Sequence, residues 1–286
     1  MNPAATSAGA APTHDDLAGQ RSTLELLAET ASRVSAHTSA LNSVALRLLA
    51  LDGRVANLAA KALRGPQPAD TAKWRGSLPG ESSSKTLAAV PKIRLLAVHG
   101  VDGNTSLLEL ALLASLVKIA GARAVFEFGT FDGRTAVNLA ANCALGGTVF
   151  TLDLPSEQAN VTRLPLDDRD KVYIDKPAPG ARYKGTPFET SIVQLHGDSA
   201  AFDFSRFHNA TDFVFIDASH KYEYVLNDTR IALRLLRDGR GTIAWHDYTQ
   251  WWDGVVRALE ELHATEPKLA GMRHIEGTDL VYTRVE

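Results

Sequence analysis

Short apolar runs alternate with segments of helical spacing after about residue 85, and this alternation constrains the fold more than any other feature. The predicted strands are 124–128, 148–152, 191–195, 213–216 and 242–245. Helical spacing is found in 107–119, 135–145, 222–236 and 255–263. Strands that alternate with helices pair in parallel through right-handed crossovers. We therefore predict an α/β fold, a doubly wound and mostly parallel sheet. Segments 272–275 and 280–284 are expected to add a terminal antiparallel pair.

The first 85 residues lack this alternation and divide into three parts. Residues 1–21 are rich in Ala, Gly, Thr and Pro and are predicted to be a disordered tail. Residues 22–63 carry a seven-residue apolar repeat, namely Leu27, Val34, Leu41, Leu48 and Val55. This repeat predicts a long helix that forms a coiled coil and a homo-oligomer, with packing on the same chain as the alternative. Residues 64–85 are rich in Pro, Gly and Ser and are predicted to link the helix to the α/β domain, 86–286.

Charge and hydropathy argue against several partners and locations. The formal net charge of −3 does not indicate binding to nucleic acid or to an anionic membrane surface. The most apolar stretch, 107–120, is too short for a membrane span and contains Glu109 and Lys118. The N-terminus lacks the basic start and apolar run of a secretory signal, so a cytoplasmic location is expected.

Acidic residues follow all five predicted parallel strands. They are Asp132 in the turn after the first strand, and then Asp153, Asp198, Asp217 and Asp247. In open α/β sheets, ligands bind beyond the carboxyl ends of the strands, near the point where the strand order reverses. Gly129 and Gly133 flank the first turn, where they allow the backbone to approach a ligand closely. We therefore predict a ligand site at this edge of the sheet.

The charge of this turn indicates the kind of ligand. Asp153 lies about 20 residues beyond the glycine turn, where a carboxylate suits ribose hydroxyls. A dinucleotide site would read GxGxxG and hold pyrophosphate at the helix N-terminus. Here the spacing is GxxxG, with Glu127 before it and Asp132 inside it. These carboxylates would repel pyrophosphate but accept the ammonium and sulfonium groups of S-adenosylmethionine.

The run VFEFGTFDGRT resembles motif I of the class I S-adenosylmethionine-dependent methyltransferases. With GDS, FIDASHKYEYVLND and GTIAWHDY, it is similar to a bacterial group of small-molecule O-methyltransferases that includes sugar and antibiotic-tailoring enzymes and cephalosporin-hydroxylase-like relatives. The resemblance covers roughly residues 95–284 and implies a hydroxyl acceptor on a small molecule or sugar. It also implies cofactor contacts for these residues: Glu127, Gly129, Asp132 and Gly133 around the methionine half, Asp153 at the ribose, and Asp198 with Ser199 beside the adenine.

A looser resemblance to catechol-type O-methyltransferases implies a base and a metal site. In those enzymes the aspartate after strand four binds Mg²⁺, a lysine three residues later is the base, and an Asp-Asn pair completes the site. The matching residues here are Asp217, His220 and the pair His246-Asp247. An imidazole can replace the lysine as a base because it titrates near 6.5. The replacement of the Asp-Asn pair by His246-Asp247 leaves open whether a metal binds, because Mg²⁺ prefers oxygen ligands. Asp217 is then either a metal ligand or a partner of the cofactor amine.

Other residues and functions are less constrained by the sequence. Tyr248, Trp251 and Trp252 are expected either to form an aromatic wall for the acceptor or to pack in the core or a lid. The charged run 167–171 is expected to be a solvated loop. A nicotinamide-dependent oxidoreductase is an alternative function, opposed by the missing GxGxxG and by Glu127. A non-catalytic assembly protein with a degenerate cofactor domain is another, opposed by the complete set of acidic strand ends.

Overall fold

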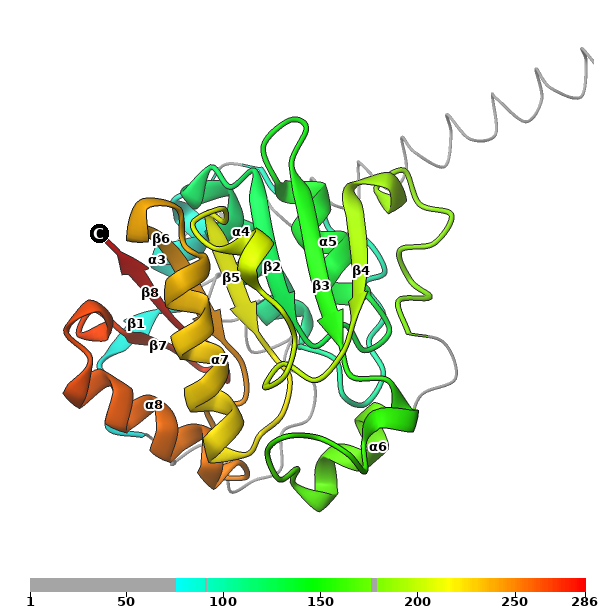
Figure 1. Cartoon of the computed structure of the whole chain (residues 1–286). Coiled ribbons are helices and arrows are strands. Elements are labelled where there is room, and N and C mark those ends of the chain that lie inside the picture. The colour runs from blue at the N-terminus through cyan, green and yellow to red at the C-terminus, as the bar shows by residue number, and fades with distance from the viewer. Residues whose placement is uncertain (1–75, 91, 176–178) are drawn as a thin grey trace, which may run out of the picture. The chain divides into compact units, whose positions relative to one another are not determined.

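The computed structural model describes residues 76–90, 92–175 and 179–286. The predicted disordered tail, the coiled coil and most of the linker lie outside these residues. Within them, eight strands form one mostly parallel sheet that helices cover on both faces (Figure 1). This architecture confirms the predicted fold class. None of the helices in these ranges has the length and apolar character needed to cross a lipid bilayer.

The strand order in the sheet is β1-β7-β8-β6-β5-β2-β3-β4. The bounds are β1 Gly80–Ser82, β2 Ala124–Phe128, β3 Thr148–Asp153, β4 Ile192–His196, β5 Phe213–Ile216, β6 Gly241–Trp245, β7 Arg273–Glu276 and β8 Val281–Val285. Strands β2 to β6 are mutually parallel, and β8 runs antiparallel to both β6 and β7. All five predicted parallel strands are found within one residue of their expected ends, and the terminal antiparallel pair is confirmed.

Helices and short 3₁₀ turns connect the strands. The α-helices are α3 Ser83–Ala88, α4 Leu107–Ala120, α5 Arg134–Asn142, α6 Lys171–Ile174, α7 Tyr222–Leu235 and α8 Asp253–Thr265. The 3₁₀ turns are η2 Ser156–Gln158, η3 Asp168–Asp170, η4 Glu189–Ser191, η5 Ser205–Phe207, η6 Arg237–Gly239 and η7 Pro267–Leu269. Helix α4 begins at a capping box between Ser106 and Glu109 and ends at Gly121 in the left-handed conformation.

The order of the strands creates a switch point between β2 and β5. From β2 the chain adds β3 and β4 on one side, then returns to place β5 and β6 on the other side of β2. The connections at the carboxyl ends of β2 and β5 therefore lead away in opposite directions. Such a reversal opens a crevice beyond the strand ends, as predicted for the ligand site.

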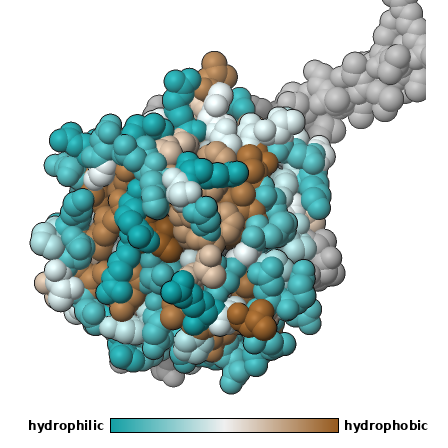
Figure 2. Space-filling model, viewed as in Figure 1, coloured by the Kyte–Doolittle hydropathy of each residue, from teal (hydrophilic) through white to brown (hydrophobic). Residues whose placement is uncertain are grey.

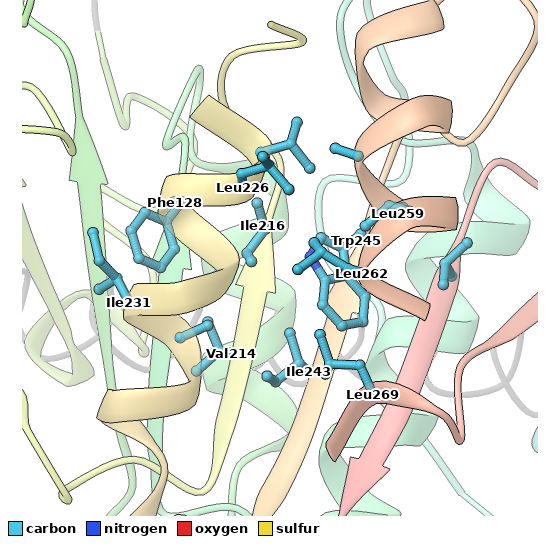
Figure 3. Packing of buried hydrophobic residues seen from close by; sticks show 14 of the residues in the cluster. Phe128, Val214, Ile216, Leu226, Ile231, Ile243, Trp245, Leu259, Leu262 and Leu269 are labelled. Carbon is cyan, nitrogen blue, oxygen red and sulfur yellow. The ribbon is translucent and has the colours of Figure 1, made fainter. Parts of the chain in front are cut away.

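Two apolar layers hold the helices on the sheet. On one face, α7 and α8 pack on side chains such as Val214, Ile243 and Trp245, with Leu259 and Leu262 next to the indole ring (Figure 3). On the other face, α4 and α5 pack on Val125, Val149 and Phe215 among others. Apolar residues on the outside lie in separate patches between polar ones on the face seen in Figure 2. Because successive side chains of a strand point to opposite faces, Phe126 and Phe128 belong to the first layer and Glu127 to the side of the second.

Secondary structure is present in part of the segment that was predicted to be linker. Residues 80–82, expected to be linker, pair in parallel with β7, and α3 follows directly. Leu78 is buried and its backbone N–H donates to the hydroxyl of Tyr248 at 3.2 Å. A polar three-residue strand such as Gly-Glu-Ser has no apolar period, so its backbone pairing could not be anticipated.

Candidate functional site

A cleft that is partly open to solvent lies beyond the carboxyl ends of β2 to β5. It brings together five of the predicted site residues: Gly129, Asp153, Asp198, Ser199 and Asp217. Its apolar lining includes Phe128, Leu152, Leu154, Leu166, Ile174 and Tyr224. Apolar walls with a few convergent carboxylates are typical of a small-molecule site.

Both glycines of the first turn are required by close contacts. Gly129 has a φ of +91°, and a Cβ atom there would lie 1.9 Å from the backbone oxygen of Asp217. The backbones that follow β2 and β5 therefore lie too close together for any side chain at position 129. Gly133 has a φ of +84° and caps α5, and a Cβ there would lie 2.7 Å from the ring of Tyr183.

Glu127 lies under this turn with its side chain fully buried. The hydroxyl of Thr151 donates to Glu127 Oε2 at 2.5 Å, while Oε1 has no hydrogen-bond partner among the described residues. Burial, together with the charges of Asp217, Asp153 and Asp132, raises the pKa of Glu127 well above its ordinary value. A cation bound here would offset this repulsion, which is the chemistry that an ammonium group supplies.

The other predicted cofactor residues already have partners in the protein. Asp153 Oδ1 accepts from the backbone N–H groups of Thr130 and Phe131, at 3.2 and 3.4 Å. Asp132 accepts from the N–H of Arg134 and forms an ion pair of 2.6 Å with Arg182.

Asp198 is held by three protein donors, namely the N–H of Arg163, the N–H of Ala200 and the hydroxyl of Tyr224. It therefore holds the loop after β4 in place, and Ser199 beside it lines the cleft.

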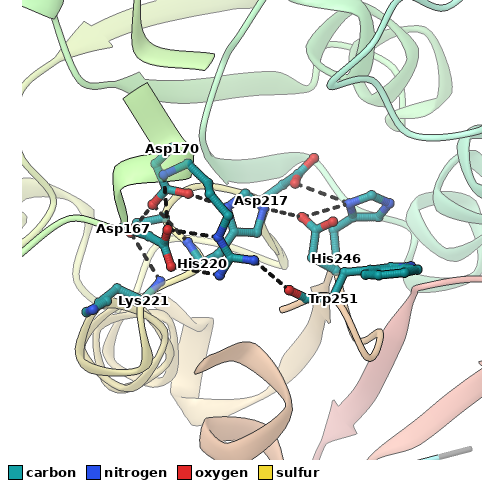
Figure 4. Close-up of polar contacts among 10 residues, drawn as sticks. Asp167, Asp170, Asp217, His220, Lys221, His246 and Trp251 are labelled. Carbon is teal, nitrogen blue, oxygen red and sulfur yellow. Dashed lines mark hydrogen bonds and ion pairs between the residues drawn. The ribbon is translucent and has the colours of Figure 1, made fainter. Parts of the chain in front are cut away.

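His220 lies between two carboxylates, one at each ring nitrogen. Nδ1 is 2.5 Å from Asp170 Oδ1, and Nε2 is 2.8 Å from Asp247 Oδ2 (Figure 4). Burial alone lowers the pKa of His220, but Asp247 and Asp170 outweigh it and raise the pKa to about 10. Both nitrogens of the ring thus donate, as an imidazolium does. In this arrangement His220 has no lone pair for an incoming proton.

His246 occupies the centre of a second group of carboxylates. Nδ1 is 3.1 Å from Asp247 Oδ2 and 3.4 Å from Asp217 Oδ1, and Nε2 is 3.3 Å from Glu109 Oε2. Burial lowers the pKa of His246, but these three carboxylates raise it well above 6.5. Burial by itself raises the pKa of Glu109. The positive charge of His246 has the opposite effect, and the pKa of Glu109 is lowered to about 2.

One set of donors in the described residues meets the geometry of a cation site. Asp217, His246 and Asp247 each offer a ligand atom, and these atoms lie within 4.8 Å of one another. Glu109 stands behind the ring of His246, in the position of the carboxylate that orients many metal-bound histidines. Four carboxylates face two imidazoles here, so two negative charges remain when both rings are protonated and all four acids ionised. The donors and the charge fit a divalent cation.

Sequence reasoning missed two residues of this cluster. Asp170 was expected in a solvated loop, but only 3% of its surface is exposed, because the segment around it, between β3 and β4, packs against the loop after β5. Glu109 was noted only as a charge that argues against a membrane span. The Ser-x-x-Glu pattern at 106–109 indicates its capping box, but no local signal indicates its pairing with His246.

The three aromatic residues after β6 differ in their surroundings. Tyr248 is fully buried and its hydroxyl donates to Glu260 at 2.8 Å, so it packs in the core. The ring of Trp252 stacks on His220, with centroids 3.6 Å apart, and the guanidinium of Arg169 lies 4.1 Å from the Trp252 centroid. Trp251 is 58% exposed beside this stack. Trp251 is therefore the most exposed of the three rings, whereas Tyr248 is closed to an acceptor.

Comparison with known proteins finds a family for the segment that contains this cleft. A family model described as "Methyltransferase domain" matches residues 126–248, which contain every predicted site residue. No curated protein matches the sequence.

Several solved structures are similar to the chain in three dimensions. An O-methyltransferase from Bacillus cereus in complex with SAH is 22% identical, covering 67% of this chain and 84% of its own, with a TM-score of 0.46. TomG from Streptomyces achromogenes, an O-methyltransferase involved in tomaymycin synthesis and solved with SAM, is 16% identical, covering 67% and 93%, with a TM-score of 0.46. An SAH-bound methyltransferase from Podospora anserina is 15% identical, covering 65% and 81%, with a TM-score of 0.47.

The match to the family model agrees with the acidic cleft and with the GxxxG turn, neither of which suits a dinucleotide. Residues 126–248, less than half of the chain, therefore match a methyltransferase domain.

Proposed function

We propose that this enzyme transfers the methyl group of S-adenosylmethionine to a hydroxyl group of a small molecule or sugar. The observation that carries the proposal is the position of the histidine and carboxylate cluster. Asp217 lines the large cleft and also a smaller cavity formed with His220, His246 and Asp247. A histidine that could serve as a base once its Nε2 is freed from Asp247, and a set of ligands for a cation, thus lie beside the cleft. Hydroxyl acceptors need such groups, because they must lose a proton during transfer.

The cofactor is expected to bind along the acidic edge of the sheet. The free oxygen of Glu127 and the surrounding negative charge suit the ammonium group of its methionine half. Asp153 is assigned to the ribose, and Ser199, on the loop that Asp198 holds, to the adenine. Asp132 and Gly133 shape the turn from their positions beside Arg182 and Tyr183.

Transfer requires an acceptor oxygen in line with the carbon–sulfur bond of the cofactor. The oxygen forms a bond to the methyl carbon, the carbon–sulfur bond breaks, and sulfur keeps the electron pair as S-adenosylhomocysteine leaves. Holding the two reactants in this geometry can contribute roughly 7–11 kcal/mol. The protein is therefore asked mainly to position the acceptor and to remove its proton.

His220 is assigned the role of base, acting through Nε2. In the structure Nε2 donates to Asp247. For His220 to act as the base, Asp247 must turn away and the ring must lose its Nε2 proton. Binding of a cation by Asp247 would supply both changes, since the carboxylate would then no longer compensate a charged ring. Nδ1 would stay bonded to Asp170 and leave Nε2 free for the acceptor proton.

Asp217, Asp247 and Nδ1 of His246 would hold this cation. When bound, a divalent cation acidifies a coordinated hydroxyl and so lowers the demand on the base. Mg²⁺ is the ion that the resemblance to catechol-type enzymes implies, whereas an imidazole ligand also admits cations that accept nitrogen. We further propose a cytoplasmic enzyme that forms a homo-oligomer through residues 22–63.

Methyl transfer from labelled S-adenosylmethionine tests the proposal. The probes are catechol and methyl α-D-glucopyranoside as hydroxyl acceptors, with aniline and thiophenol as amine and thiol controls. We expect label in a hydroxyl probe, loss of transfer after EDTA treatment, and recovery with Mg²⁺, Mn²⁺ or Zn²⁺ added separately. His220→Gln should lower turnover by roughly 10²–10⁴-fold, the usual contribution of a general base.

Each element of the proposal can fail separately. Transfer to the amine or thiol alone would contradict a hydroxyl acceptor. Activity that is unaffected by EDTA would exclude the cation, and full activity of His220→Gln would exclude the base.

A further inference from the structure

Asp170 differs from the charged residues around it. It ends the 3₁₀ turn η3, inside the insertion between β3 and β4, and only 3% of its surface is exposed. Its neighbour Asp168 has a side chain that is 92% exposed and pairs with Lys171 at the surface. Burial of a carboxylate is unfavourable unless it is paired and hydrogen-bonded. The partners of Asp170 are therefore informative about its role.

These partners all belong to the loop after β5. The hydroxyl of Ser219 donates to Asp170 Oδ2 at 2.7 Å, and the backbone N–H of His220 donates to the same oxygen at 3.2 Å. The other oxygen, Oδ1, lies 2.5 Å from Nδ1 of His220 (Figure 4). One carboxylate thus holds the backbone of the loop and the orientation of the imidazole together.

We propose that Asp170 is a positioning residue for methyl transfer, which fixes Nδ1 of His220 as a proton donor and directs Nε2 toward the reacting hydroxyl. The inference rests on the proposed function, in which His220 is the base. A base that is oriented by a third group through its other nitrogen is a recurring arrangement in catalysis. The insertion, for which the sequence indicated no role, then supplies part of the catalytic machinery.

Among the described residues around His220, Asp170 is the one that bonds to Nδ1. Among the described residues, the groups facing the ring are Asp247 at Nε2, Trp252 stacked on its face and Tyr173 with its centroid 6.2 Å away. None of these bonds to Nδ1. Arg169, next to Asp170, donates to the backbone oxygen of Trp251 at 2.8 Å and lies over Trp252, which ties the same segment to the loop after β6.

The test compares Asp170→Asn with Asp168→Asn in the full-length protein. Both changes remove one negative charge from the same short segment, but only the first removes the buried carboxylate. With the labelled assay and the hydroxyl probes above, Asp170→Asn should lower kcat by about 10²-fold or more. The KM for the acceptor and the affinity for S-adenosylhomocysteine should stay near wild type. Asp168→Asn should behave as wild type throughout.

A double variant distinguishes positioning from a general loss of structure. If Asp170 acts through His220, then Asp170→Asn combined with His220→Gln should be no slower than His220→Gln alone, because residues that act as a unit are not additive. Multiplied losses in the double variant would overturn the inference, as would an Asp170→Asn enzyme with wild-type kcat.

An NMR measurement without acceptor keeps the inference separate from the proposed function. The short Nδ1–H bond of His220 to Asp170 should give a strongly deshielded ring proton in the wild type, assigned to His220 by its loss in His220→Gln and to Nδ1 by its correlation with that ring nitrogen in ¹⁵N-labelled protein. This signal should disappear in Asp170→Asn and persist in Asp168→Asn. Its persistence in Asp170→Asn would overturn the inference, whereas failure of wild type to methylate any hydroxyl probe would instead contradict the proposed function.

Discussion

Replacing Gly129 by alanine tests whether the close meeting of β2 and β5 shapes the cofactor site. The added Cβ would lie 1.9 Å from the backbone oxygen of Asp217 and 2.7 Å from its carbonyl carbon. Neither neighbour is a flexible side chain, so the backbone after β5 must move by more than about 1 Å to reach ordinary van der Waals contact. This movement would strain or break the bond of 2.9 Å from the Asp217 N–H to the Phe128 oxygen.

The size of the effect follows from three contributions. A left-handed φ costs an alanine roughly 1–2 kcal/mol relative to glycine. Loss of one backbone hydrogen bond costs about 1 kcal/mol, and the residual overlap adds strain of about 1–3 kcal/mol. We expect Gly129→Ala to lower the free energy of unfolding by at least about 3 kcal/mol. A misplacement of about 1 Å at Asp217 should also lower turnover by about 10²-fold.

Gly146→Ala is the matched control. Gly146 also has a positive φ, +73°, but a Cβ there meets no atom within 4 Å. It should therefore lose only roughly 1–2 kcal/mol, with unchanged cofactor binding. Urea denaturation of both variants gives the two free energies, and thermal shift with S-adenosylhomocysteine reports binding. Equal destabilisation of the two variants, with binding retained in both, would refute the role assigned to this contact.

Three further predictions address charge, pH and assembly. Glu127→Gln should leave the ligand-free protein as stable as wild type or more stable, because it removes a buried charge near other acids, but should weaken S-adenosylhomocysteine binding in calorimetry. The raised pKa of His220 means that its stabilising contribution is complete below pH 6.5 and is lost as pH rises through about 10. The stability difference between wild type and His220→Gln in urea should therefore shrink over that range. Deletion of residues 1–63 should lower the oligomeric state in light scattering while leaving cofactor binding unchanged.

The fold could be predicted from sequence because its signals are local and periodic. Strand β5 is a continuous apolar run, and β2 is apolar except for Glu127, which is the pattern of a sheet buried on both faces. The acidic residues at the strand ends could be placed at one edge for the same reason, since parallel strands end together. Strand β1 carries no such signal, because its short polar sequence pairs with β7 through the backbone.

The partners within the site were harder to predict, since they depend on segments far apart in the chain. Asp132 lies in a turn that suits a ligand, but its carboxylate forms an ion pair with Arg182, fifty residues later in the chain. Asp170 appears in a charged run that resembles many exposed loops, and only the folded insertion shows that it faces His220. Local pattern gives the position of a residue on an element, whereas its hydrogen-bond partners are set by the tertiary fold.

Calorimetric titration of the full-length protein with S-adenosylhomocysteine and with NAD tests the central claim most directly. A cleft lined by Asp153 and Asp217 above the buried Glu127 should bind the ammonium group and the ribose of a nucleoside amino acid and repel a pyrophosphate. We predict saturable binding of S-adenosylhomocysteine, weakened by Asp153→Ala, and no binding of NAD under the same conditions. Binding of NAD without binding of S-adenosylhomocysteine would contradict it.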